Sequence, residues 1–350
     1  MESNDFKRHI AVTGGAGFIG SNLLLLLVPR YPDDFFVNID ALTYAGNLSN
    51  LATIEGADNY RFERLDITEP EAVRECFRRY KFDGVIHLAA ESHVDRSILG
   101  PEAFVRTNVL GTANLLEAAR AQEHSVRFVH VSTDEVFGSL EQVGKFTAES
   151  PYRPSSPYAA SKAAADHLVR AYHRTYGMET IITNCSNNFG PYQFPEKLIP
   201  LVIRNAVAGK PIPVYGNGLQ RRDWLFVRDH CEALDRAFRR GRSGATYLAG
   251  ADTDITNIDL IRRLCRALDA RLGGTPREQL ITHVTDRPGH DYRYALDVSS
   301  LREELEWRPQ CTFDEALEAT IDWYLTHEDW LAACDSGVYR EYYEQNYANR

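Results

Sequence analysis

Two neighbouring carboxylic acids follow a predicted strand near the middle of the chain. Residues 128–131 form a short apolar run typical of a buried strand, and Ser132, Thr133, Asp134 and Glu135 come directly after it. Two carboxyl groups in one site can take different pKa values and act as acid and base. A solvated acidic loop is the alternative. We favour acid–base chemistry, because ligands of parallel sheets bind at the carboxyl ends of the strands, where this triplet lies.

A glycine-rich segment near the N-terminus has the spacing of a dinucleotide-binding turn. Gly14, Gly17 and Gly20 lie between a predicted strand at residues 10–12 and a predicted helix. Such glycines allow a tight turn, close approach of the backbone to a pyrophosphate, and close packing of helix on strand. The free N–H groups of the helix would then face the phosphates. The alternative is a turn whose glycines serve only its conformation.

Asp40 supports the dinucleotide interpretation. It ends the second predicted strand, 20 residues after Gly20. A carboxylate there can accept hydrogen bonds from a ribose diol and would repel a 2′-phosphate, so we expect NAD rather than NADP. A loop aspartate that caps a turn is the alternative. The cofactor is also expected to lie against the residues that end the third and fourth strands. These are Asp66, Ile67, Leu88, Ala89 and Ala90.

A tyrosine and a lysine are spaced to share one face of a helix. Ser156 suits an N-cap and Pro157 the first helical position, which places Tyr158 and Lys162 four residues apart on the helix that follows. A tyrosine with its ordinary pKa near 10 is a poor base at neutral pH. We expect the lysine ammonium and the positive nicotinamide to lower this pKa, so that the phenolate takes a proton from a substrate hydroxyl. An exposed helical pair is the alternative.

These groups need a parallel sheet to bring them together. Apolar runs alternate with amphipathic stretches in the first half of the chain, which predicts an α/β fold, a doubly wound parallel sheet of the Rossmann type. We expect an NAD-binding domain over residues 1–186, to which part of about 220–250 returns. Residues 187–350, richer in proline and glycine, are expected to form mainly a smaller α/β substrate-binding domain.

The predicted elements follow from apolar runs and stop signals. Strands are expected at residues 10–12, 35–39, 61–65, 85–88, 128–131 and 180–183. A helix over residues 19–28 is expected to end at Pro29. A second helix is expected to begin with a capping box of Thr68 and Glu71, with Pro70 in its first turn.

Charge and cysteine content narrow the class of protein. A net charge of −10 argues against binding to nucleic acid or an anionic membrane. The six cysteines form no CxxC pair or metal knuckle, so we expect reduced thiols in a cytoplasmic protein and no metal. Residues 1–8 are polar and the apolar run 23–28 is too short to span a membrane.

Tyrosines gather near the end and are expected to pack on their own domain or a partner subunit. They are Tyr339, Tyr342, Tyr343 and Tyr347.

The chain resembles the dTDP-glucose 4,6-dehydratase family of extended short-chain dehydrogenases over almost its whole length. Six segments carry the resemblance: TGGAGFIG at 13–20, DALTYAGN at 40–47, LAAESHVD at 88–95, STDEVFG at 132–138, YAASK at 158–162 and DRPGHD at 286–291. Many nucleotide-sugar enzymes share the first and fifth. The Thr-Asp-Glu triplet and the last segment are far more specific.

The resemblance implies tightly held NAD, a homodimer, and a three-step reaction on dTDP-glucose. Tyr158 would take the proton of the 4-hydroxyl, held by Thr133, while hydride passes from carbon 4 to NAD. Glu135 would then remove the carbon-5 proton, which the new ketone acidifies, and Asp134 would protonate the departing 6-hydroxyl. Hydride would return to carbon 6, which gives a 4-keto-6-deoxy sugar nucleotide.

The family pattern also implies binding residues. Those implied for NAD, beyond the residues given above, are Phe18, Ile19, Leu42, Thr43, Ser92, Thr107, Tyr158, Lys162 and Asn188. Those implied for the substrate are Ser92, Thr133, Asn187, Lys197, Leu198, Pro213, Tyr215, Arg222, Asn257, Arg287 and His290. Arg222 and Arg287 suit bidentate binding of phosphate, with a surface ion pair as the alternative for each. The sequence departs from the pattern at Phe137, where tyrosine is common, and at Leu248, where asparagine is common.

Three rival functions are weighed against this one. A nucleotide-sugar 4-epimerase would use Tyr158, Lys162 and NAD but has no need of Asp134 and Glu135. A GDP-mannose dehydratase shares the acid–base logic but should differ in the half that binds the base. An NAD-sensing regulatory protein would be expected to lose Tyr158 or Lys162, and this chain keeps both. UDP-glucose stays open as the substrate, since thymine and uracil differ by one methyl group worth ~1 kcal/mol.

Overall fold

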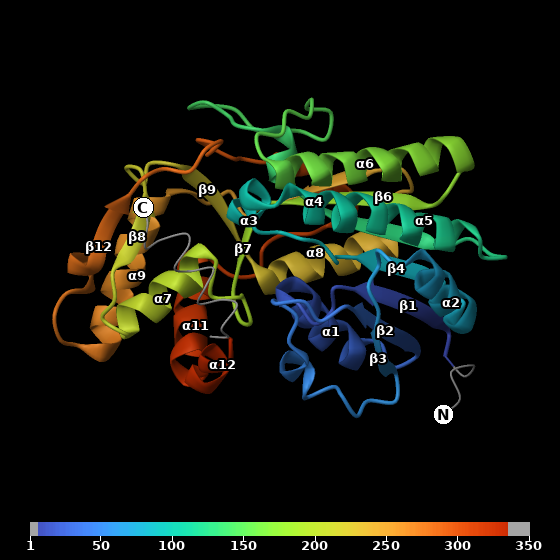
Figure 1. The fold of residues 1–350 in the computed structure, drawn as a ribbon, viewed down its shortest axis with the longest axis horizontal. Helices are drawn as coiled ribbons and strands as arrows, with labels where there is room; N and C mark the ends of the chain where they lie inside the picture. The colour runs from blue at the N-terminus through green and yellow to red at the C-terminus, as the bar shows by residue number, and fades with distance from the viewer. Residues whose placement is uncertain (1–5, 335–350) are drawn as a thin grey trace.

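A seven-stranded sheet forms the centre of the computed structural model, which describes residues 6–334 (Figure 1). The strand order is β10-β6-β5-β4-β1-β2-β3, and every neighbouring pair is parallel. The strands are β1 (Arg8–Thr13), β2 (Asp34–Asp40), β3 (Tyr60–Arg64), β4 (Gly84–His87), β5 (Arg127–Thr133), β6 (Thr180–Cys185) and β10 (Thr246–Ala249). The chain winds outward in both directions from β1, which confirms the predicted doubly wound sheet.

Helices cover both faces of this sheet (Figure 1). One face packs against α1 (Phe18–Arg30) and α8 (Val227–Arg240), whose leucines join the strand residues in one core. The other face packs against α2 (Pro70–Tyr80), α5 (Thr112–Arg120) and α6 (Pro157–Tyr176) in a second core. Between β4 and α5 the chain forms α3 (Val94–Leu99), α4 (Pro101–Phe104) and the π-helical turn η3 (Val105–Gly111). Strands buried on both sides explain the nearly continuous apolar runs of the sequence.

Two predicted helix signals are wrong. Helix α1 does not end at Pro29 but includes it and continues to Arg30; Pro29 lacks the N–H that would donate to the carbonyl oxygen of Leu25, and the helix ends one residue later. The capping box of Thr68 and Glu71 does not form, because α2 has Glu69 as its N-cap and Pro70 as its first residue. The Thr68 N–H donates instead to Asp66 Oδ1 at 2.8 Å, in a turn that precedes the helix.

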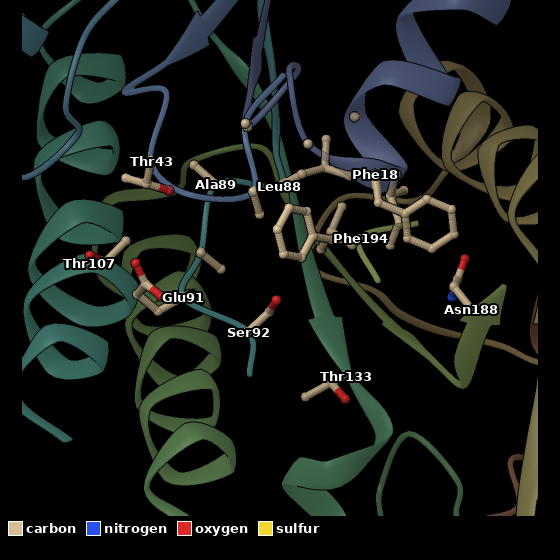
Figure 2. A pocket seen from close by; sticks show the side chains of 18 of the residues that line it. Phe18, Thr43, Leu88, Ala89, Glu91, Ser92, Thr107, Thr133, Asn188 and Phe194 are labelled. Carbon is tan, nitrogen blue, oxygen red and sulfur yellow. The ribbon is translucent and has the colours of Figure 1, made fainter. Parts of the chain in front are cut away.

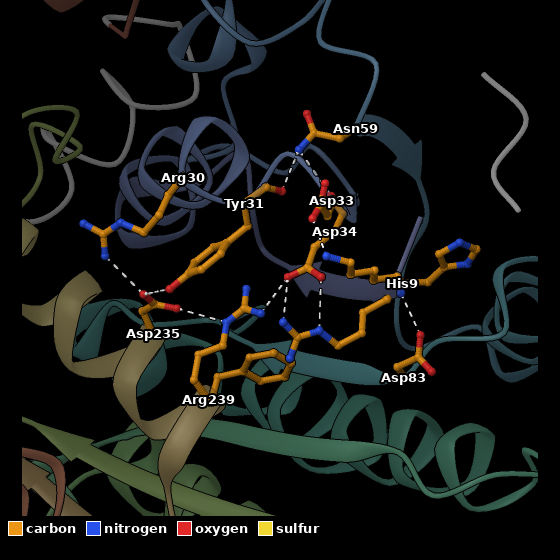
Figure 3. Close-up of polar contacts among 12 residues, drawn as sticks. His9, Arg30, Tyr31, Asp33, Asp34, Asn59, Asp83, Asp235 and Arg239 are labelled. Atoms are coloured by element: carbon orange, nitrogen blue, oxygen red, sulfur yellow. Dashed lines mark hydrogen bonds and ion pairs between the residues drawn. The ribbon is translucent and has the colours of Figure 1, made fainter. Parts of the chain in front are cut away.

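Helix α8 comes from the second half of the chain, yet buried ion pairs tie it to the first half (Figure 3). Arg239 donates to Asp34 at 2.6 Å and to Asp235 at 3.3 Å. Arg30, in the last turn of α1, donates to Asp235 at 3.1 Å, and Arg8 donates to Asp34 at 3.1 Å. Removal of one partner from a buried ion pair typically costs about 3–5 kcal/mol. The network therefore fixes α8 against the sheet.

The rest of the second half has its own core. Two small sheets form it, β7 (Asn187–Phe189) with β9 (Arg221–Phe226) and β11 (Asp254–Thr256), and β8 (Ile212–Tyr215) with β12 (Ile281–Val284). The helices of this core are α7 (Leu198–Val207), α9 (Asn257–Leu272), α11 (Phe313–Thr326) and α12 (Glu328–Ala333), whereas α10 (Ser299–Leu305) packs in the core of the large sheet with α8. Short 3-10 turns are η2 (Leu48–Leu51), η4 (Asp134–Phe137) and η5 (Arg277–Leu280).

Strand β10 and helix α8 lie with the large sheet, whereas α7, α9 and α11 pack together in the separate core. The division at residue 186 stays a prediction.

The four clustered tyrosines, Tyr339 to Tyr347, lie outside the described residues. Within residues 6–334, none of the helices combines the length and apolar character needed to cross a membrane.

Candidate active site

A cavity of about 330 Å³ lies at the carboxyl ends of the parallel strands (Figure 2). Its size is typical of a small-molecule site. The predicted residues that line it are Gly14, Gly17, Phe18, Ile19, Gly20, Asp40, Thr43, Asp66, Ile67, Leu88, Ala89, Ala90, Ser92, Thr107, Thr133, Asp134, Glu135, Tyr158, Lys162, Asn187, Asn188 and Lys197. Residues far apart in the sequence therefore meet at one edge of the sheet, while the role of each stays a prediction.

The glycine turn leaves room for a pyrophosphate. Gly14 has φ +71°, and a Cβ on it would lie 2.7 Å from the backbone nitrogen of Ala89. A Cβ on Gly17 would meet only the carbonyl oxygen of Gly14, at 3.3 Å, and Gly17 lines the cavity. Gly17 is also the N-cap of α1 and provides no side-chain cap, so the first N–H groups of the helix face open space.

Asp40 is oriented by the backbone around it. Its Oδ1 accepts from the N–H of Leu42 at 2.8 Å and its Oδ2 from the N–H of Ala16 at 3.0 Å. Burial raises the pKa of Asp40, and these two hydrogen bonds oppose that shift. Both oxygens keep lone pairs for a ribose diol. Leu42 does not line the cavity. Its N–H positions Asp40 instead, and its own φ is +56°.

The tyrosine and the lysine both line the cavity. Burial raises the pKa of Tyr158 well above its ordinary value, the charge of Glu135 adds to the shift, and a hydrogen bond with Thr133 opposes it. Lys162 Nζ donates to the carbonyl oxygen of Val131 at 2.8 Å. The expectation that Lys162 and the positive nicotinamide together lower the pKa of Tyr158 stays a prediction.

The two carboxylic acids lie in a 3-10 turn that directly follows β5. Thr133 ends β5 and caps the turn η4: its hydroxyl accepts from the N–H of Glu135 at 3.3 Å and donates to Asp134 Oδ1 at 3.2 Å. Successive side chains of a 3-10 turn diverge by about 120°. The two carboxyl groups can therefore still reach different atoms of one sugar.

Burial raises the pKa values of both carboxyl groups, but the charged neighbours act on the two groups unequally. It raises the pKa of Asp134 well above the ordinary value, the charge of Glu135 adds to this, and Arg222 opposes it. Burial also raises the pKa of Glu135, but three cations oppose that shift, namely Arg287, Arg222 and Lys197. Asp134 Oδ2 has no hydrogen-bond partner within residues 6–334. The site thus favours a neutral Asp134 as the acid and an ionised Glu135 as the base.

The predicted phosphate-binding arginines lie beside the cavity rather than in its lining. Arg222, on β9, is only 5% exposed and donates to the carbonyl oxygens of Tyr292 at 3.3 Å and Asp291 at 2.9 Å. Arg287 lies 4.0 Å from Asp95, and its buried Nε has no hydrogen-bond partner in the described part of the chain. A surface ion pair is therefore the wrong interpretation for Arg222.

Tyr215 and His290 join the same polar group. The hydroxyl of Tyr215 donates to Asp95 Oδ2 at 3.1 Å, and His290 Nδ1 lies 2.6 Å from Asp286 Oδ1. The Tyr215 and His290 rings meet edge to face, with centroids 6.1 Å apart. The other predicted substrate residues outside the cavity lining are Leu198 at the start of α7, Pro213 in β8 and Asn257 at the start of α9.

Part of the loop between β7 and α7 lines the cavity without having been predicted from the sequence. Phe194 lines it (Figure 2), as does Glu196, together with the predicted Lys197. Glu196 accepts from the hydroxyl of Tyr44 at 2.8 Å and from Arg96 Nε at 3.3 Å. Neither residue belongs to a spaced motif. The nearest signal is Tyr44, which lies in a segment that carries the family resemblance.

Comparison with known proteins agrees with this geometry. A family model described as GDP-mannose 4,6 dehydratase matches residues 11–320. A dTDP-glucose 4,6-dehydratase from Xanthomonas campestris pv. campestris is 53% identical over 340 residues, which cover 94% of this chain and 96% of the relative. A dTDP-glucose 4,6-dehydratase from Escherichia coli K12 is 49% identical over 362 residues, covering 97% and 99%.

Solved structures agree as well. The dTDP-glucose 4,6-dehydratase of Streptomyces venezuelae, with NAD and a second ligand bound, is 44% identical, has a TM-score of 0.88 and covers 93% of this chain and 100% of that chain. The UDP-glucose 4-epimerase of Thermotoga maritima is 25% identical, with a TM-score of 0.82 and coverage of 91% and 99%. Fold and site thus define an extended short-chain dehydrogenase that acts on nucleotide sugars. Within that class, the chain belongs to the dTDP-glucose 4,6-dehydratase family.

Proposed function

We propose that this protein converts dTDP-glucose to dTDP-4-keto-6-deoxyglucose and water, as an NAD-dependent hydro-lyase. The observation that carries the proposal is the pair of buried Asp134 and partly buried Glu135, which shares a cavity with Tyr158. Its two carboxyl groups have different electrostatic surroundings, as an elimination that needs one acid and one base requires.

The residues of the cavity fit NAD. The open N-terminus of α1 and the space over Gly17 suit a pyrophosphate, and Asp40 suits an unmodified adenosine ribose. When bound, NAD accepts a hydride from carbon 4 of the sugar and returns it to carbon 6. Tyr158 and Lys162 line the same cavity and are the residues that would lie against the nicotinamide ribose.

The protein's own groups then divide the proton transfers. Tyr158, hydrogen-bonded to Thr133, takes the proton of the 4-hydroxyl. Glu135, whose ionised form is stabilised by Arg287, Arg222 and Lys197, removes the proton at carbon 5. Asp134, kept neutral by burial, gives its proton to the leaving 6-hydroxyl. The cations near Glu135 also suit the pyrophosphate of the substrate.

The alternatives fit less well. A 4-epimerase would leave Asp134 and Glu135 without a role, although burying two carboxyl groups together is costly. A regulatory protein without activity would have no reason to keep Tyr158, Lys162 and the carboxyl pair in one cavity. UDP-glucose stays the second candidate substrate, since it shares all the reacting atoms.

The test is an assay of dTDP-, UDP- and GDP-hexoses with purified protein, in heavy water, with products identified by mass. We expect loss of water and one solvent deuterium at carbon 5, fastest with dTDP-glucose. Glu135→Gln should still reduce NAD but lose the exchange at carbon 5. Asp134→Asn should reduce NAD and keep the exchange, but not lose water. Product epimerised at carbon 4 without loss of mass would refute the dehydratase and favour the epimerase.

We also propose a homodimer that works in the cytoplasm. Apolar side chains are exposed along the segment between β4 and α5: Leu99 is 64%, Val105 51% and Leu110 55% exposed. A row of this kind is typical of a surface that a second subunit covers. The six cysteines are free thiols, as expected in a reducing compartment.

A further inference from the structure

Behind Lys162 lie a histidine and an aspartate that the steps above do not use. Lys162 and Asp166 are four residues apart on α6, so they share a face, and His130 on β5 lies beside both of them. His130 Nε2 is 3.4 Å from Lys162 Nζ and 3.2 Å from Asp166 Oδ1. His130 and Asp166 are both 0% exposed, and neither lines the cavity. The cavity-lining lysine and a fully buried carboxyl group thus meet at the same edge of the imidazole.

Asp166 is held as an anion. Its Oδ2 accepts hydrogen bonds from Ser132 Oγ at 2.9 Å, Tyr152 Oη at 2.7 Å and Asn184 Nδ2 at 3.3 Å. Burial alone would raise the pKa of Asp166, but His130, Lys162 and Tyr152 together bring it below its ordinary value. All three donors to Oδ2 are uncharged.

His130 is neutral. Burial lowers its pKa to about 4, and the charge of Lys162 adds to that shift. Its buried Nδ1 has no hydrogen-bond partner in the described part of the chain. Because a buried N–H without a partner costs ~1–3 kcal/mol, the proton belongs on Nε2, 3.2 Å from Asp166 Oδ1. Lys162, His130 and Asp166 are all buried, so the attraction between Asp166 and Lys162 is only weakly screened by solvent.

We propose that Asp166, together with the neighbouring His130, is the counter-ion that keeps Lys162 charged and in place for the oxidation step. Asp166 and His130 are then positioning residues, which act through Lys162 on Tyr158. The inference rests on the proposed function in one respect, that Tyr158 is the base. Lys162 is 4% exposed, and burial lowers its pKa to about 8 even though Asp166 opposes that shift.

The other titratable groups around Lys162 cannot replace this counter-ion. They come from all the elements packed against it: Tyr158 on α6, His130 on β5, His87 on β4 and Cys185 on β6. Burial lowers the pKa of His87 well below its ordinary value and raises that of Cys185 to about 12, so neither is an anion at neutral pH. Arg170 lies further out and donates to the hydroxyl of Tyr152 at 2.8 Å.

The test compares pH profiles of the wild type, Asp166→Asn and Tyr152→Phe. The readout is the rate at which reduced cofactor forms in a single turnover, with whichever nucleotide hexose the wild type oxidises. In the wild type the rate should fall on the alkaline side as Lys162 loses its proton. In Asp166→Asn the rate should begin to fall at a pH at least about one unit lower than in the wild type. At a pH within the falling part of the profile, the variant should therefore be about tenfold slower. KM should change less than about threefold, because Asp166 does not line the cavity.

Tyr152→Phe is the matched control. It removes one hydrogen bond from the same carboxylate but keeps its charge, so its alkaline limb should stay in place. Equal limbs in Asp166→Asn and the wild type, or equal shifts in Asp166→Asn and Tyr152→Phe, would overturn the proposal in favour of a packing role.

A second pair of variants decides the case if Asp166→Asn does not fold. His130→Gln keeps a polar side-chain amide next to Lys162 and Asp166 and should retain the wild-type limb. His130→Ala admits water and should shift the limb in the acidic direction. Unmoved limbs in both variants would overturn the proposal. If dTDP-glucose is not the substrate, the proposed function fails but this test does not, since it uses whichever sugar nucleotide reduces the cofactor.

Discussion

Replacement of Asp134 by asparagine should make the protein more stable while it removes the elimination step. The side chain is buried, its Oδ2 lacks a hydrogen-bond partner within residues 6–334, and burial raises its pKa well above the ordinary 3.8. The unfolded chain ionises this carboxyl as the pH rises through about 3.8, while the folded protein keeps it neutral to higher pH. The unfolded state then binds fewer protons, so the free energy of unfolding falls as the pH rises through that window.

The size of the effect follows from the shift. Each pKa unit of difference between folded and unfolded states lowers the free energy of unfolding of the wild type by about 1.4 kcal/mol once the pH exceeds both values. Asparagine is neutral in both states and avoids this loss. At pH 7 the variant should therefore melt higher than the wild type, by roughly 2 °C for each kcal/mol. Below pH 4 the two proteins should be equally stable.

The assay measures thermal unfolding from pH 3 to pH 8, with the same saturating NAD for every variant because ligand binding itself raises the melting temperature. Elimination is followed in parallel and should fall about 100- to 10,000-fold in Asp134→Asn, while the reduction of NAD persists. Glu135→Gln is the control: it leaves Arg287, Arg222 and Lys197 without their carboxylate, so it should gain less stability or lose some. If Asp134→Asn tracked the wild type at every pH, Asp134 would not be a neutral acid.

Four further outcomes are expected. Asp40→Ala should weaken NAD binding and narrow the preference over NADP, as titration with both cofactors will measure; tighter NADP binding by the wild type would contradict this. Tyr158→Phe should fold normally but form no reduced cofactor with substrate, and a near-normal rate would require another base. Gly20→Ala, whose Cβ would overlap Gly14, should lower the free energy of unfolding by about 1–3 kcal/mol in urea, although alanine normally favours helices. Leu99→Asp should convert a dimer to a monomer in light scattering, and an unchanged mass would remove this surface from the interface.

Most of the large sheet can be predicted from the sequence. Its inner strands are buried on both faces, so their sequences are continuous apolar runs. The ends of each predicted strand lie within a few residues of the ends of the observed strand. The cofactor half of the cavity is predictable for the same reason. Gly14, Asp40 and Ala89 lie at the carboxyl ends of β1, β2 and β4, which are neighbours in the sheet. Parallel strands bring their carboxyl ends to one edge. The ends of helices are harder to predict. Whether α1 continues past Pro29, and whether Glu69 is the N-cap of α2, depends on local hydrogen bonds of similar strength.

The second half of the site could not be derived from spacing. Arg222 and Arg287 were named through the family resemblance, but a lone arginine in a sequence carries no sign of burial. Their positions depend on β9 pairing with β7 and β11 and on the loop after β12, contacts between segments tens of residues apart. His130 and Asp166 were missed altogether. One occupies an apolar strand and the other a helix, and only the packing of α6 on β5 shows that they meet behind Lys162.

The separation of the two carboxyl groups explains why the site needs both halves of the chain. Asp134 and Glu135 both lie on η4, Asp134 buried and Glu135 partly buried, and loss of solvent there raises both pKa values. The cations that oppose this effect at Glu135 are Lys197, Arg222 and Arg287, all from the second half. Only Arg222 is among the principal influences on Asp134, where the negative charge of Glu135 acts in the other direction. The second half therefore not only binds a nucleotide but also decides which carboxyl group is the base.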